Sequence, residues 1–325
     1  MPEFTTSFSI FDKDVLIREM QLKEYKVVLK CLLGESPDHN VIIPNLFPVV
    51  KECTNLNMAD IQALDFVDFF ILLCSIRINS VGNMLYLSIN NTDETIPTKI
   101  TLNLDSVINY IIKCKEKILL EYKDRNCDGV LVNFRIPTVL ELAYSDKLDY
   151  IDSSIFVSKL IVNGKDVNVA GLDLEYRRNL FDMLPAKVSS KIIRQCVDIT
   201  KSLNDINMLD VLPNIDLLKS HKLPFSIKIQ DFCYLVKLIF SDDLMSIYNN
   251  IYRLSRYSNI SAEYLETCTP GEFQIYIKNL EAERNAQNNT GNSEDVGISN
   301  ETDMDLEEEY SDVDFSKTSP SEFTG

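Results

Sequence analysis

The sequence predicts an α+β protein that is predominantly α-helical, and three observations support this fold class. Apolar residues recur at helical spacing along most of the chain, above all between residues 173 and 286. Two short segments, 83–90 and 98–104, have the composition and bounding residues of β-strands. Residues 287–325 are acidic and contain few large apolar side chains. We therefore expect N-terminal helices with short antiparallel β-hairpins, a C-terminal helical module and a disordered acidic tail.

The chain is expected to divide into two modules and a tail, because 325 residues exceed the usual single domain. Pro137 and Thr138 mark the predicted boundary. The divisions are 1–136 (N-terminal helix plus β-hairpin module), 137–286 (mainly helical module) and 287–325 (disordered tail). No apolar run reaches the length of a membrane-spanning helix, and no secretory signal is recognised at the N-terminus.

The N-terminal module is expected to begin with helices and to continue with strands. The predicted helices cover residues 14–34 (ending at Gly34), 42–54, 57–82 and 105–116. The predicted strand pairs are 83–90 with 98–104, and 118–123 with 130–137. The second pair surrounds an Asp128-Gly129 step, which favours a tight turn.

The C-terminal module is expected to start with mixed helix signals over residues 138–145 and 149–161. A tight hairpin at Asn163-Gly164 follows, and the chain is expected to be almost wholly helical from Asp173. The predicted helical segments are 173–184, 186–206, 229–240, 242–258 and a last helix within 268–283. Short connections separate them, and no repeat of 20 to 50 residues is present, so a solenoid is not expected.

Sites for chemistry are sparse in this sequence. It contains eight dispersed cysteines without a C-x-x-C pair and only two histidines, so we expect free thiols, a reducing compartment and no metal site. No nucleotide-binding loop, nucleophile elbow or metalloprotease motif occurs, and we expect neither catalytic residues nor a cofactor. Asp65 and Asp68 stand three residues apart on an apolar helix and are expected to share a polar face.

The net charge of −17 is concentrated at the C-terminal end. Residues 287–325 contain eleven acidic residues and one lysine, so about −10 of the charge lies there. Such a tail repels nucleic acid, and no basic stripe elsewhere compensates for it, so a nucleic-acid partner is not expected. The tail is either a solvated segment or a docking segment that binds a basic partner through Tyr310 and Phe315.

The segment 268–283, CTPGEFQIYIKNLEAE, contains a complete helix-start signal. Thr269 and Glu272 form a capping box, and Pro270 stands at the first helical position. An apolar stripe of Phe273, Ile277 and Leu280 follows, with Tyr276 at its edge. The helix is either a terminal helix packed on its own domain or also a docking surface, and Tyr276 is then the expected anchor.

Two motifs resemble the baseplate hub and hub-assembly proteins of contractile phage tails of the T-even type. The front motif follows an apolar helix and consists of Arg77, Ser80, Val81 and Gly82, leading into a strand. The second motif combines Y-x-x-x-Y-x-L, beginning at Tyr248 and Tyr252, with T-P-x-E-x-x-x-Y, formed by Thr269, Glu272 and Tyr276. The resemblance extends over roughly residues 13–285, with gaps. This sequence lacks the C-x-x-C pair that can follow the front motif in the family, which argues against a structural zinc.

The resemblance implies an interaction protein rather than an enzyme, with Tyr248, Tyr252, Thr269, Glu272 and Tyr276 as candidate interaction residues. The implied partners are other baseplate hub or tape-measure proteins, and the implied location is the host cytoplasm during assembly. The chain is expected to act as an assembly chaperone or scaffold. The alternatives are a hub subunit retained in the virion and, in another class, a host-directed adaptor that binds through its acidic tail.

Overall fold

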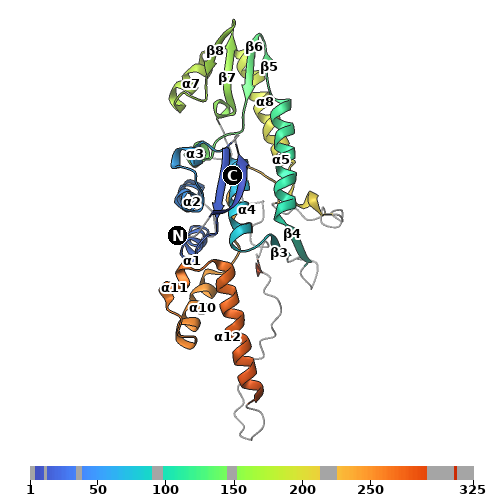
Figure 1. The fold of residues 1–325 in the computed structure, drawn as a ribbon. Coiled ribbons are helices and arrows are strands. Elements are labelled where there is room, and N and C mark those ends of the chain that lie inside the picture. Colours follow the sequence, from blue (N-terminus) through green and yellow to red (C-terminus); the bar gives the residue numbers. More distant parts are fainter. Residues whose placement is uncertain are drawn as a thin grey trace, which may run out of the picture.

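The computed structural model describes residues 4–10, 13–33, 39–89, 98–144, 152–212, 225–290 and 311–312. The predicted fold class is confirmed, because helices dominate and the strands are short and mostly antiparallel. Figure 1 shows an elongated molecule in which the sheet β5–β8 lies at one end and helices α10, α11 and α12 lie at the other. Most of the acidic tail falls outside the described residues.

The N-terminal elements form the central part of the molecule (Figure 1). In order they are β1 (Phe4–Ile10), β2 (Lys13–Arg18), α1 (Leu22–Cys31), α2 (His39–Cys53), α3 (Met58–Ala63), α4 (Phe66–Ser80), β3 (Met84–Ile89), β4 (Thr98–Asn103) and α5 (Leu104–Glu121). β1 and β2 form one antiparallel hairpin, and β3 and β4 form another, as predicted for residues 83–104.

The chain begins with a hairpin rather than with the helix that was predicted over residues 14–34. Val15 and Ile17 are buried, whereas Leu16 between them is 39% exposed, which is the alternation of a strand. Pairing of β2 with β1 satisfies the backbone of this segment, so the helix begins only at Leu22. The predicted helix end at Gly34 lies outside the described residues.

The predicted helix over residues 57–82 is divided into α3 and α4. Leu64 adopts an extended conformation between them, with φ −58° and ψ 138°. Asp65 then caps α4, because its side chain accepts hydrogen bonds from the backbone N–H groups of Val67 (3.0 Å) and Asp68 (2.9 Å). A second cap signal inside the apolar run therefore starts a new helix.

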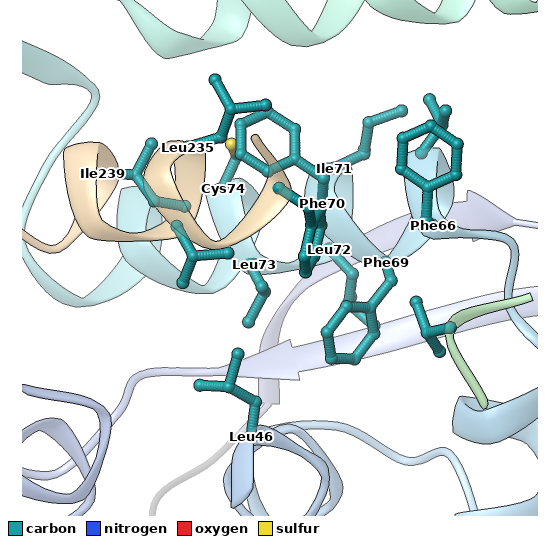
Figure 2. Packing of buried hydrophobic residues seen from close by; sticks show 14 of the residues in the cluster. Leu46, Phe66, Phe69, Phe70, Ile71, Leu72, Leu73, Cys74, Leu235 and Ile239 are labelled. Carbon is teal, nitrogen blue, oxygen red and sulfur yellow. The ribbon is translucent and has the colours of Figure 1, made fainter. Parts of the chain in front are cut away.

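The main hydrophobic core surrounds α4, whose side chains are buried on nearly all sides. Figure 2 shows these side chains between Leu46 of α2 and two residues of α9, Leu235 and Ile239. α9 (Phe232–Ile239) also places the Phe232 ring in contact with Phe66, Phe69 and Phe70 of α4, with ring centroids 6.2–6.3 Å apart. The C-terminal helix α9 thus completes a core built mostly by N-terminal elements.

The residues of the front sequence motif join three elements at the end of α4. The buried Arg77 side chain donates to the backbone carbonyls of Ile239 (2.9 Å), Gly82 and Met84 (3.3 Å). Ser80 accepts a hydrogen bond from the backbone N–H of Met20 at 2.8 Å. Gly82 has φ +129°, a conformation that favours glycine. The motif therefore fixes the helix-to-strand turn and ties it to α9.

The predicted strand over residues 118–123 is wrong, because α5 continues to Glu121. The apolar run Ile118-Leu119-Leu120 fits both a strand and a helix end, and only Ile118 is buried, whereas Leu120 is 74% exposed. The strand that pairs with β6 is instead Arg125–Cys127.

A four-stranded sheet with order β5-β6-β7-β8 forms one end of the molecule. In chain order, this region contains β5 (Arg125–Cys127), β6 (Val130–Phe134), α6 (Val139–Ala143), η1 (Ser153–Phe156), β7 (Val157–Val162), β8 (Lys165–Asn168), α7 (Leu174–Asp182) and α8 (Ala186–Asn204). Of these, α6 packs on α2 and α3 in the central part. Both predicted turns are confirmed: the two central residues at Asp128-Gly129 and at Asn163-Gly164 have positive φ angles, as tight hairpins require.

The remaining helices follow in the second half of the chain, as predicted for the residues after 173. They are η2 (Met208–Val211), α9, α10 (Leu244–Tyr257), α11 (Ala262–Thr267) and α12 (Pro270–Thr290). α12 extends past residue 287, where the tail was predicted to begin. β6 lies before the predicted domain boundary between residues 136 and 137, and its partner strand β7 lies after it. The division into two domains at this boundary stays a prediction.

Candidate interaction surface

α10 presents two faces with different chemistry. Asp243 caps the helix by accepting hydrogen bonds from the backbone N–H groups of Met245 (3.0 Å) and Ser246 (2.9 Å). One face packs on the core through the buried residues Leu244, Ile247, Ile251 and Leu254. These positions follow the spacing of an amphipathic helix, so the remaining apolar residues of α10 are left at its surface.

Three of those residues, Met245, Tyr248 and Tyr252, form a line at positions i, i+3 and i+7. We call this line the α10 stripe. Met245 is 63% exposed, Tyr252 is 60% exposed and Tyr248 is 37% exposed. Exposed tyrosine and methionine side chains are enriched at protein–protein interfaces, so this line has the composition of a contact surface.

α1 lies beside the α10 stripe and adds positive charge to it. The ammonium groups of Lys26 and Lys30 lie 5.0 and 5.9 Å from the centre of the Tyr248 ring, within the range of cation–π contacts. Lys26 also pairs with Glu266 of α11, whereas Lys30 is exposed. Val27, between them in sequence, is 42% exposed.

Tyr252 is held in place by its neighbour one turn along α10. Arg256 donates a hydrogen bond to the Tyr252 hydroxyl at 2.6 Å, and its guanidinium lies 5.9 Å from the ring centre. A shallow hollow of about 570 Å³ borders Tyr252 and is otherwise lined by polar side chains, those of Asp243, Ser246, Asn249, Asn250 and Arg253. The stripe therefore has a polar margin that offers hydrogen-bond donors and acceptors.

The capping box predicted for α12 is confirmed. The Thr269 backbone N–H donates to Glu272 at 2.9 Å, and the Glu272 backbone N–H donates to the Thr269 hydroxyl at 3.1 Å. Phe273, Ile277 and Leu280 are buried, as the apolar stripe predicted. In this structure Thr269 and Glu272 set the start of α12, and a contact of either residue with a partner stays a prediction.

Tyr276 lies at the edge of the buried face of α12 and is half-buried. Its hydroxyl is 3.3 Å from that of Tyr264 on α11, and the two rings meet edge to face with centroids 6.4 Å apart. This hydrogen bond raises the pKa of Tyr264 to about 12. Tyr264 is 52% exposed, so the pair presents aromatic area chiefly through Tyr264.

The structure distributes the predicted residues over two neighbouring places rather than one. Tyr248 and Tyr252 belong to the α10 stripe, whereas Tyr276 contacts Tyr264 on α11. The sequence interpretation omitted Met245 and Tyr264. Met245 could have been found from its spacing of three residues before Tyr248, but the exposure of Tyr264 depends on how α11 packs against α1 and α10.

A buried cluster of charges lies apart from this surface, where α4 meets α5. Lys115 pairs with Asp65 at 2.6 Å and also with Asp68, which confirms that the two carboxylates share a polar face. Burial, followed by the nearby Asp65 charge, raises the pKa of Asp68 to about 6. Each member has a partner of opposite charge, and the cluster therefore joins the two helices.

Comparison with known proteins identifies the family. Residues 1–207, more than half of the chain, match the family described as T4 bacteriophage base plate protein. The chain belongs to this family. The matched part of this base plate protein includes Arg77 and Gly82, and it ends before α9 and the α10 stripe.

No curated protein and no solved structure matches this base plate protein. Among the residues that the structure describes, no group of three or more His, Cys, Asp or Glu side chains is arranged to hold a metal ion. None of the helices in the described ranges has the length and apolar character that a membrane span requires.

Proposed function

We propose that this base plate protein acts in assembly of the baseplate hub, as a chaperone or scaffold that binds other hub subunits or tape-measure proteins in the host cytoplasm. The observation that carries the proposal is the α10 stripe, with Met245 and Tyr252 both at least 60% exposed. The family supports a role in the baseplate, and the α10 stripe offers a surface for contact with another protein.

The chemistry of the α10 stripe suits a protein partner. Tyrosine offers a large apolar area, a polar hydroxyl and few rotatable bonds, so ordering it at an interface costs little entropy. Arg256 already orients Tyr252 through its hydrogen bond, which reduces that cost further. The polar hollow beside Tyr252 can form the rim of a contact whose centre is apolar.

The test is affinity purification of the tagged protein from infected cells, with Tyr252→Ser as the variant. Tyr252 is 60% exposed, so the variant should fold normally and recover less hub protein by more than tenfold, about 1.4 kcal/mol. Tyr176→Ser on α7 is the matched control, because Tyr176 is 67% exposed and lies outside the α10 stripe. Equal recovery with both variants at unchanged stability would refute a contact through Tyr252.

The second candidate function is a structural hub subunit that stays in the virion. The family description, a base plate protein, favours this candidate. Quantitative mass spectrometry of purified particles and of infected-cell lysate separates the two functions. A subunit is present in particles at a fixed ratio to the other baseplate proteins, whereas a chaperone is present in the lysate and absent from particles.

A further inference from the structure

Strand β3 has a different partner strand along each of its two edges. Along one edge of β3, all six residues from Met84 to Ile89 pair with β4. Along the other edge, within the part of the chain that the structure describes, Leu87 and Ser88 pair with β9 (Ser311–Asp312) in parallel orientation. The tail segment that contains β9 therefore adds a third strand to this sheet, giving the order β4-β3-β9.

This edge of β3 is suited to accept a strand. Leu85 and Leu87 are buried and fix the strand on the core, whereas Met84 and Tyr86 face outward, 36% and 49% exposed. Arg77 holds the Met84 carbonyl at the start of the strand. A firmly held edge strand presents N–H and C=O groups in a fixed row, which another extended segment can pair with.

The charge of the tail also fits this sheet. The only charged residue in β3 and β4 is Lys99, which is exposed. In the strand register Ser88 pairs with Lys99 on one side and with Asp312 on the other, so these three residues stand in one row across the sheet. Asp312 belongs to the acidic sequence EEEYSDVDF, residues 307–315. The acidic sequence of the tail and the positive charge on this sheet are complementary, which favours their association.

We propose that the edge of β3 that faces away from β4 is a strand-binding site for an extended acidic segment, and that in the isolated protein the chain's own Ser311 and Asp312 occupy it. This inference goes beyond the proposed function, because it assigns a second binding surface distant in sequence from the α10 stripe. The tail is thus an intramolecular ligand of β3.

The test uses the full chain and hydrogen exchange of the β3 amides. The variant carries Ser311→Pro and Asp312→Pro, because proline has no N–H to donate and disrupts strand pairing. Exchange of the β3 amides that do not bond to β4 should become at least tenfold faster. The matched control carries Ser299→Pro and Asn300→Pro, also in the tail but outside β9, and should behave as the wild type.

A labelled peptide of residues 303–317 provides the second measurement. The Ser311→Pro, Asp312→Pro protein should bind it at least tenfold more tightly than the wild-type protein, whose edge is already occupied, and a scrambled peptide should bind neither. Equal β3 exchange in all three proteins, or equal binding of the scrambled peptide, would overturn the proposal. Protection that increases with protein concentration would also overturn it, because a second copy would then supply the strand.

Discussion

Lys115 shows at the level of single residues how buried charge joins two helices. Its ammonium group faces Asp65 and Asp68, and all three side chains are largely buried. Lys115→Met should therefore lower the free energy of unfolding by about 3–5 kcal/mol, because two buried carboxylates lose their cation. Lys113→Met on the exposed side of α5 is the control and should have little effect. Similar denaturation midpoints for both variants would contradict the role assigned to Lys115.

Asp68 gives the cluster a defined dependence on pH. Burial, and then the charge of Asp65, raises the pKa of Asp68 to about 6, above its usual value of 3.8. Between these values the folded protein retains a proton that the unfolded chain has lost, so Asp68 makes stability fall as the pH rises from about 4 to about 6. Asp68→Asn should flatten the stability profile in this range. An unchanged slope in denaturation experiments at several pH values would contradict the assignment.

The capping residues of α12 allow a test of local structure. Thr269→Ala removes the hydroxyl that accepts the Glu272 backbone N–H, and should cost about 0.5–2 kcal/mol of stability. Gln274→Ala on the exposed side of the same helix should be nearly neutral. Thermal unfolding of both variants measures the difference, and equal midpoints would show that the cap contributes nothing to stability.

At the scale of elements, most helices could be predicted from the sequence, because the apolar spacing and the capping residues indicate the same helix at each place. The turns at Asp128-Gly129 and Asn163-Gly164 were also predicted, since few residues tolerate positive φ angles. One predicted helix, 57–82, is divided at Leu64 and Asp65. The wrong element types concern residues 14–21 and 118–123, where a short apolar run fits both periods. Pairing with β1 decides the first case and continuation of α5 decides the second, and neither is visible in the local sequence.

The candidate surface was predictable to a similar extent. The tyrosines of α10 could be selected from their spacing, but their exposure depends on which face of α10 packs on the core. Likewise, the contact of Tyr248 with Lys26 and Lys30 joins segments more than 200 residues apart. Such contacts follow from tertiary packing, so the sequence could identify candidate residues and not their grouping.

At the scale of the whole molecule, the described core is complete without most of the tail. Phe232 of α9 and Phe273 of α12 are fully buried, whereas the described part of the tail after residue 290 contributes only the two-residue strand β9. Deletion of residues 291–325 should therefore shift the thermal midpoint by roughly a few degrees at most. A large loss of cooperativity on deletion would show that the tail is part of the folded core.

The central claim is that this base plate protein works through contacts with other baseplate proteins. Gradient sedimentation of infected-cell lysate, followed by quantitative mass spectrometry of each fraction, tests it most directly. The protein should sediment with hub proteins in fractions much heavier than a 37.2 kDa chain, and Tyr252→Ser should move it toward the light fractions. Recovery of the wild-type protein only as a free chain, at every stage of infection, would contradict the claim.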